Sequence, residues 1–243
     1  MAMEHRYFSV CALLLCLTLG SGCAQLAVVP PTPARNLDPH EFLEPPPGER
    51  YYVTFFASQT TPRVPQLTHS WGTVIHVVER EDGKPPLVEY HTISWMPSTL
   101  DIRPLNFKIE PAVNLGLHET LKFALARGEH VSQWGPYECR PNLYHRFLVQ
   151  KGFLESGNFG YQLIDTVGEA GRTGNGSNCI HAMTDMDPQM SRNHYPLIRY
   201  GNSATRFIVQ ECRRREVLKN PGQTHTWLNS YLGLCSFPII HRD

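Results

Sequence analysis

The feature that most constrains the fold is a pair of strand-like segments joined by a turn. Residues 71–78 and 87–95 are rich in β-branched and aromatic side chains, which favour extended backbone. Between them, Glu81-Asp82-Gly83-Lys84 has the composition of a tight turn. This pattern predicts a hairpin and therefore an antiparallel sheet. With the turn centred on its Asp-Gly pair, His76 falls opposite Glu89.

Other segments carry weaker strand or helix signals. Aromatic residues 51–56 predict one further strand, and residues 161–165 predict a short one. Apolar spacing or a capping residue predicts helices at 114–128, 141–154, 179 to about 187, and 204–218. Strands and helices are grouped rather than alternating. We therefore predict an α+β fold in which a small antiparallel sheet packs against helices.

The first 23 residues have the layout of an export signal. A short basic start precedes the apolar run 10–19, which is too short for a transmembrane helix. The ending Leu19-Gly20-Ser21-Gly22-Cys23 resembles a bacterial lipobox, although Gly20 stands where a large aliphatic residue is usual. We expect 1–23 to be a lipoprotein-type signal peptide. The protein would then be lipid-anchored to a membrane of the bacterial cell envelope through Cys23, or secreted to the periplasm.

Composition separates a tether from a domain. Residues 24–50 contain seven prolines, which predicts an extended tether that cannot pack a core. Residues 51–243 are enough for one well-buried domain. The formal net charge is zero, and basic and aromatic residues are not interleaved. We therefore expect no nucleic-acid partner.

One cysteine has the sequence context of a nucleophile. Cys179 follows Asn178, a good N-cap residue, and would lie in the first turn of a helix. The positive end of the helix dipole favours thiolate over thiol, and the small residues of 174–178 would leave the sulfur accessible. These are the conditions for nucleophilic catalysis. The structural alternative is a buried or disulfide-bonded cysteine.

A thiol nucleophile needs a base and a third group that orients the base. His69, at the mouth of the second predicted strand, is the first choice of base because a strand end can face a helix N-terminus. For the third group we rank His91 above Glu89, with Ser94 a remote third. The hairpin register places none of these directly across from His69, which falls opposite Met96. A β-bulge would be needed to bring one of them there.

The remaining domain cysteines raise the question of disulfides, because an exported protein can form them. Cys139, Cys212 and Cys235 accompany Cys179 in the domain. If Cys179 is free, at most one pair forms among the other three, and Cys212 with Cys235 is the preferred pair. The sequence does not choose between the possible pairings.

His69 on an early strand, with Asn178-Cys179-Ile180-His181 far downstream at a helix start, resembles the circularly permuted papain-like hydrolases. These are permuted relatives of NlpC-type cell-wall peptidases and include bacterial lipoprotein amidases and the lecithin:retinol acyltransferase group. The resemblance covers about residues 51–218. It implies a small antiparallel sheet packed on the cysteine helix, with Cys179 as nucleophile and His69 as base. The family's third polar residue lies on the next strand, where His91 stands at a longer spacing than in the acyltransferase branch.

These expectations define the hypotheses for function. The first is an envelope-tethered thiol hydrolase or acyltransferase that cleaves amide or ester bonds of a peptide or acyl substrate, with no cofactor and no metal. The second is a non-catalytic envelope lipoprotein that binds cell-wall or protein partners on the same scaffold. A third is a metal site of His69, His91 and His181, although no short ligand spacing of the HExxH kind accompanies them.

Overall fold

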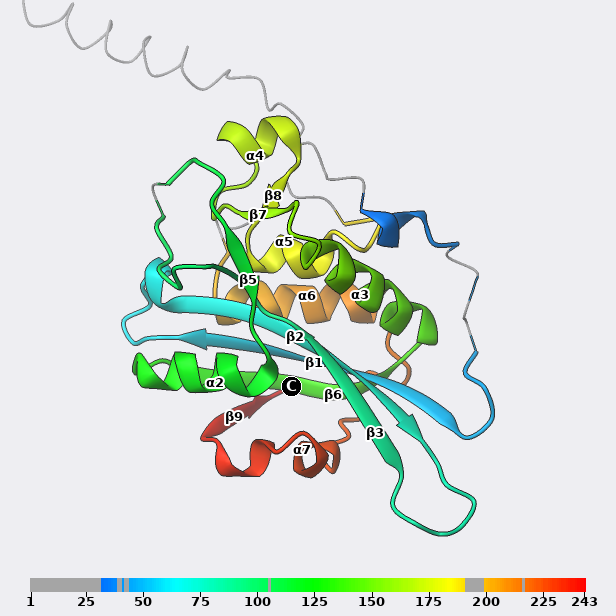
Figure 1. Ribbon diagram of the computed structural model, residues 1–243. Coiled ribbons are helices and arrows are strands. Elements are labelled where there is room, and N and C mark those ends of the chain that lie inside the picture. Colours follow the sequence, from blue (N-terminus) through cyan, green and yellow to red (C-terminus); the bar gives the residue numbers. More distant parts are fainter. Residues whose placement is uncertain (1–31, 39–40, 42–43, 105, 191–198, 216) are drawn as a thin grey trace, which may run out of the picture.

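A computed structural model describes residues 32–38, 41, 44–104, 106–190, 199–215 and 217–243 (Figure 1). Its centre is a five-stranded mixed sheet in the order β3-β2-β1-β6-β9. The strands are β1 (Glu49–Gln59), β2 (Thr68–Val78), β3 (Leu87–Ile93), β6 (His130–Cys139) and β9 (Ile239–Arg242). All neighbours pair antiparallel except β6 and β9, which pair parallel. The predicted α+β class is confirmed.

The predicted hairpin is present as β2 and β3. Its register places His76 opposite Glu89, as the turn position predicted. The predicted strand over 87–95 is shorter than expected, because β3 ends at Ile93. The chain then bends away into β4 (Trp95–Pro97), which pairs with β5 (Ala112–Asn114) and not with β2. This bend has a direct consequence for the candidate site.

Sequence reasoning missed β6, which is a central strand of the sheet. Gly135-Pro136 lies within it, and proline cannot donate a ladder hydrogen bond, so this segment has no clear strand signal. The structure accommodates the pair at an irregularity, where the register of β1 against β6 shifts between Val53 and Phe55. The short edge strand β9 was also missed.

Helices cover both faces of the sheet (Figure 1). Alternation along β1 divides the core, since Val53 and Phe55 join one buried cluster while Tyr52 and Phe56 join the other. The first cluster packs under three helices, α3 (Pro141–Leu154), α5 (Cys179–Thr184) and α6 (Asn202–Arg214). The second packs under α2 (Leu117–Ala126) and α7 (Leu228–Tyr231). The cysteine helix α5 thus lies on one face of the sheet.

The smaller elements flank these layers. They are the pair β7 (Gly160–Tyr161) and β8 (Gly176–Ser177), the helix α4 (Gly168–Thr173), and the 3-10 turns η1 (Pro33–Asn36), η2 (Pro65–Leu67) and η3 (Leu234–Ser236). The strand predicted over 161–165 reduces to β7.

Two of the predicted helices have shifted starts. Helix α3 has the predicted bounds, but α2 begins three residues late because Asn114 belongs to β5 and Gly116 is the N-cap. Helix α6 begins at Asn202 after the N-cap Gly201, and it ends at Arg214 rather than near residue 218.

The expectation that residues 24–50 cannot pack a core is wrong for the described part of that segment. Ala34 in η1 has 0% exposure and belongs to the core. The buried Arg146 of α3 holds this turn, donating to the carbonyl oxygens of Ala34 at 2.7 Å and Leu37 at 2.6 Å. The predicted domain boundary after residue 50 also falls inside β1. The turn is held against α3 by hydrogen bonds to its backbone carbonyls, which any sequence provides.

The four domain cysteines are all free thiols. The preferred pairing of Cys212 with Cys235 is therefore wrong: Cys212 is buried on α6, whereas Cys235 is exposed in η3. The predicted signal peptide and Cys23 lie outside the described residues. Within the part of the chain that is described, no helix combines the length and the hydrophobicity needed to cross a bilayer.

Candidate active site

Helix α5 begins as predicted, with Cys179 as its first residue and Asn178 as its N-cap. The Asn178 side-chain oxygen accepts hydrogen bonds from the backbone N–H groups of Ile180 at 2.9 Å and His181 at 3.0 Å. These contacts satisfy two donors that a helix start would otherwise leave unpaired. The cap therefore fixes the backbone on which the Cys179 thiol stands.

A buried polar cluster locks this cap in place. His181 Nδ1 lies 2.7 Å from both carboxylate oxygens of Asp165, and both side chains have 0% exposure. The same carboxylate accepts the backbone N–H of Asn178 at 3.1 Å, and the Asn178 amide donates to Leu163 O at 3.1 Å. The segment between Asp165 and α5 contains α4 and β8, so this contact joins the two ends of that segment. We interpret His181 as a positioning residue.

The sheet approaches α5 closely at one glycine. A Cβ on Gly72 of β2 would lie 3.1 Å from the Met183 sulfur and 3.5 Å from the rings of Phe55 and Phe147. A side chain there would require the Met183 sulfur to shift by a few tenths of an ångström. The missing side chain thus lets α5 pack closely against β2.

This approach brings the predicted nucleophile and the predicted base to one crevice. His69 and Ser70 from β2, Cys179 from α5, and Tyr200 and Gly201 before α6 all contribute to its walls. Its volume is about 20 Å³, which is room for about one water molecule. Cys179 is 6% exposed and His69 is 3% exposed. Both groups therefore face one small and nearly closed space.

The group that holds His69 is Ser94, which ranked last among the sequence candidates. Ser94 Oγ lies 2.8 Å from His69 Nε2, and Thr120 Oγ1 lies 2.8 Å from Ser94 Oγ. Thr120 Oγ1 also donates to Gly116 O at 2.9 Å. The bend after β3 explains this placement, because the Ser94 backbone donates to the Asn114 side chain at 2.7 Å and not to β2.

The row of hydroxyl groups is compatible with one proton arrangement that leaves His69 Nδ1 without a hydrogen. A hydroxyl donates only one hydrogen. If Thr120 donates to the carbonyl of Gly116, then Ser94 donates to Thr120 and His69 Nε2–H donates to Ser94. His69 Nδ1 then carries no hydrogen, and this buried atom has no hydrogen-bond partner among the described residues. That tautomer leaves Nδ1 as the ring nitrogen able to accept a proton.

His91 is not brought to His69. It lies opposite Val74 in the hairpin, its Nε2 is 3.0 Å from Glu89 Oε1, and its ring meets the Tyr144 ring edge to face. The partly exposed pair His91 and Glu89 thus forms a contact of its own on β3. Our ranking of the third group is corrected on this point: neither of the first two choices contacts the candidate base.

The electrostatics differ from the sequence expectation of a thiolate. Burial raises the pKa of the Cys179 thiol to about 11, although backbone N–H groups of Ser70, Cys179 and Ile180 act in the opposite direction. Burial also lowers the pKa of His69 to about 3, with a smaller contribution from Arg127. In the closed crevice both groups are therefore neutral near pH 7. Desolvation outweighs the dipole of a helix only six residues long.

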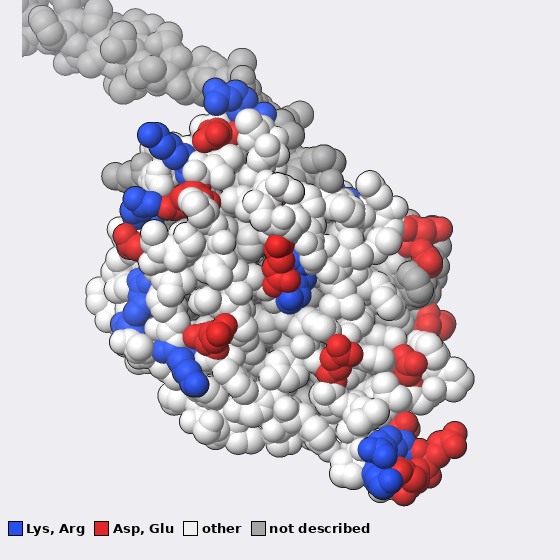
Figure 2. Space-filling view, viewed as in Figure 1, with Lys and Arg blue, Asp and Glu red and all other residues white. Residues whose placement is uncertain are grey.

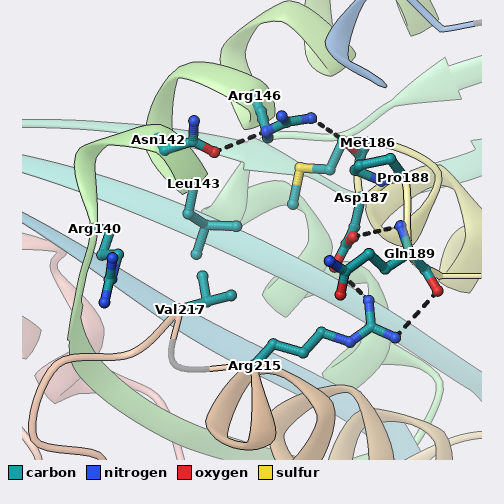
Figure 3. Close-up of a pocket in the computed structure, with 10 residues that line it drawn as sticks. All are labelled: Arg140, Asn142, Leu143, Arg146, Met186, Asp187, Pro188, Gln189, Arg215 and Val217. Carbon is teal, nitrogen blue, oxygen red and sulfur yellow. Dashed lines mark hydrogen bonds and ion pairs between the residues drawn. The ribbon is translucent and has the colours of Figure 1, made fainter. Parts of the chain in front are cut away.

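A second pocket, of about 260 Å³, lies between the start of α3 and the loop after α5 (Figure 3). Two of its three arginines have partners in the pocket wall. Arg146 Nε donates to Asn142 Oδ1 at 2.7 Å, and Arg215 binds Asp187 Oδ2 at 2.8 Å. The pocket shares no residue with the crevice. We therefore treat it as structural.

Neither the distribution of surface charge on the face in view nor the grouping of metal-ligating side chains among the described residues indicates a second candidate site. Figure 2 shows acidic and basic side chains interspersed there, with both signs gathered at the turn between β2 and β3. Within the described ranges, no three His, Cys, Asp or Glu side chains are grouped so that they could hold a metal ion. The three histidines of the metal hypothesis have separate partners: Ser94 for His69, Glu89 for His91 and Asp165 for His181.

Comparison with known proteins gave no match among protein-family models, curated proteins or solved structures. Function is therefore inferred from the geometry of the site.

Proposed function

We propose that this protein is a thiol hydrolase or acyltransferase that cleaves an amide or ester bond through Cys179 and His69. The observation that supports it best is their meeting in one crevice, although 110 positions separate them in the chain. The ring of His69 is held from behind by Ser94, as a general base requires. The proposal includes a permuted papain-like fold, because the base precedes the nucleophile and the sheet packs on the cysteine helix.

In the proposed reaction, His69 Nδ1 takes the thiol proton as sulfur attacks the substrate carbonyl. The imidazolium returns that proton to the leaving group, and an acyl group remains on Cys179. Water then releases the acid in a hydrolase, or an alcohol or amine accepts the acyl group in a transferase. The backbone N–H of Cys179 belongs to a helix start and is the candidate donor to the developing oxyanion.

Because Cys179 and His69 are both neutral in the closed crevice, the proposed reaction requires a change in the crevice. A crevice of about 20 Å³ admits no substrate, and its burial keeps the proton on sulfur. We propose that substrate binding widens the crevice and brings polar groups to it, which relieves the desolvation that separates the two pKa values. The reactive form is then the open crevice.

The proposed location is the cell envelope, through a lipid on Cys23 as the lipobox resemblance implies, with secretion to the periplasm as the alternative. Metabolic labelling with a palmitate analogue tests it. Label should enter the wild-type protein and be absent after Cys23→Ser. Equal labelling of both proteins would overturn the anchor without bearing on the site.

The catalytic proposal is tested by acyl capture on sulfur. Exposed Cys235 would react without catalysis, so a Cys235→Ser protein is the starting point. Incubation with p-nitrophenyl acetate should then add one acetyl group by intact mass, and peptide mapping should place it on Cys179. Cys179→Ala should remove the signal. Cys212→Ala is the matched control, because Cys212 is also a buried helix thiol whose pKa burial raises, to about 12.

An acetyl group that persists after Cys179→Ala, or none on any protein at concentrations that saturate ordinary esterases, would rule out thiol catalysis here.

One observation favours a second candidate, a non-catalytic envelope protein. The crevice is nearly closed and Cys179 is 6% exposed, as expected of a structural cysteine. On this hypothesis Cys179→Ala changes stability only, and the protein co-sediments equally with purified cell walls before and after the substitution. Acyl capture on Cys179 would exclude it.

A further inference from the structure

A wide groove with a cationic lining adjoins the crevice. Its volume is about 670 Å³, and four arginines contribute to its walls: Arg63, Arg199, Arg206 and Arg242. The one carboxylate side chain in the lining is that of Asp243. The groove is thus far larger than the crevice and has an excess of positive charge.

Three of the four guanidinium groups have contacts that leave their charge unneutralised. Arg63 stacks on the Tyr200 ring at 4.3 Å and Arg199 on the Phe207 ring at 4.3 Å. Arg242 donates to the hydroxyl of Ser132 at 3.3 Å. Across the described ranges, none of the four forms an ion pair with a carboxylate. Stacking orients a guanidinium plane and leaves N–H donors at its edge for an anion.

A thin wall separates the groove from the crevice. Tyr200 and Gly201 line the crevice, and the next residue, Asn202, lines the groove. The Gln59 side chain accepts the backbone N–H of Asn202 at 3.1 Å and would lie 2.9 Å from a Cβ on Gly201. Tyr200 therefore connects the two spaces: Arg63, which lines the groove, lies over its ring, and Tyr200 itself lines the crevice together with Cys179.

We propose that this groove binds an oxyanion group of the substrate, a phosphate or a carboxylate, while the scissile acyl carbon reaches Cys179 past Tyr200 and Gly201. The inference rests on the proposed function and adds a substrate class to it. Several arginines around one open space are suited to bidentate binding of such groups, and an uncompensated positive field draws anions to the groove.

Binding is tested apart from catalysis, in the Cys179→Ala protein. Isothermal titration calorimetry with inorganic pyrophosphate and with tricarballylate measures which of the two oxyanions the groove binds. The double variant Arg63→Gln/Arg206→Gln should weaken binding of the accepted probe at least about tenfold, since each arginine supplies a charge-assisted contact. Arg80→Gln, on the turn after β2, is the matched control and should leave binding unchanged.

Saturable binding of pyrophosphate alone indicates a phosphorylated substrate, and binding of tricarballylate alone indicates a carboxylate. No saturable binding of either at millimolar concentration, or binding that the double variant leaves intact, would overturn the inference.

A kinetic arm links the groove to the thiol. The Cys235→Ser protein should show a KM about tenfold lower for p-nitrophenyl hydrogen succinate than for neutral p-nitrophenyl acetate, given the salt-bridge contribution of the added carboxylate. The double variant should lose that difference. Equal KM values in both proteins would count against the groove. Acylation of Cys179 without anion binding refutes only the groove, whereas anion binding without acylation refutes only the proposed function.

Discussion

Two buried histidines lie near Cys179: His181 is two residues away in the chain, and His69 lines the same crevice. They differ in the side chain that contacts the imidazole ring. His181 has a carboxylate, Asp165, in contact with its Nδ1, whereas His69 has a hydroxyl, Ser94, in contact with its Nε2. A carboxylate stabilises a cationic ring, and a hydroxyl does so only weakly. The comparison shows that the histidine with the carboxylate partner, His181, lies within the helix start, and that the histidine with the hydroxyl partner, His69, lines the crevice together with Cys179.

The largest expected effect on stability comes from removing the Asp165 carboxylate that contacts His181. Asp165→Ala leaves His181 and the Asn178 backbone without their buried acceptor. We expect the free energy of unfolding to fall by about 4 kcal/mol, as when one member of a buried hydrogen-bonded pair is lost. Urea denaturation measures it. Asp101→Ala, at an exposed aspartate, should change stability by less than about 0.5 kcal/mol.

Equal stability of the two alanine variants would mean that the start of α5 does not depend on Asp165, and His181 would lose its positioning role.

The next effect is a pH dependence that comes from His69. Burial lowers its pKa from 6.5 to about 3, so its neutral form stabilises the fold above pH 6.5 and that contribution is lost as pH falls toward 3. Between pH 6.5 and 4 the loss is about 3 kcal/mol at 1.4 kcal/mol per pH unit. His69→Gln should remove this component from the unfolding free energy measured across the same range.

His91→Gln is the control for this measurement, because the partly exposed His91 ring meets water. Its unfolding free energy is measured across the same pH range. A His69→Gln curve that follows the wild type would contradict the buried, neutral state of His69.

The sequence predicted more of the candidate site than of the central sheet. Asn178 as N-cap, Cys179 as first helical residue and the register of the hairpin follow from local rules, and the structure has all three. Strand β6 was missed because Gly135-Pro136 is a dipeptide typical of loops. The segment forms a strand through its pairing with β1, where a shift in register accommodates the two residues. Local patterns do not contain that tertiary compensation.

The third group was misjudged for a related reason. Extending the ladder of β2 and β3 places Met96 opposite His69, but the chain leaves that ladder at Ser94 to pair with β5. Asn114, which sequence reasoning made a helix cap, is the residue that holds this bend. The thiolate expectation failed because the burial of Cys179 comes from residues distant in the chain, such as Ser70 and Gly201, that line its crevice.

A smaller effect tests the wall between crevice and groove. Tyr200→Ala should open the crevice and expose the sulfur, and water would then lower the thiol pKa from about 11. In the Cys235→Ser protein, we expect alkylation of Cys179 by iodoacetamide at pH 7.5 to become about tenfold faster, as for a pKa lower by one unit. Tyr231→Ala, at an exposed tyrosine of α7, is the control.

An unchanged alkylation rate after Tyr200→Ala would mean that another part of the crevice limits access to sulfur.

The smallest effect separates the two candidates for the third group. Ser94→Ala removes the acceptor for His69 Nε2–H and leaves the ring free to rotate or change tautomer. We expect acetylation of Cys179 by p-nitrophenyl acetate to slow about fivefold, the equivalent of one net hydrogen bond of about 1 kcal/mol. His91→Ala should leave the rate unchanged, because its polar contact is with Glu89. Ser94→Thr, which keeps the hydroxyl, should recover most of the rate, so that a loss due only to packing would be recognised. If instead His91→Ala slows acetylation and Ser94→Ala does not, the base is oriented from β3, and the hydroxyl row from Ser94 to Gly116 is structural.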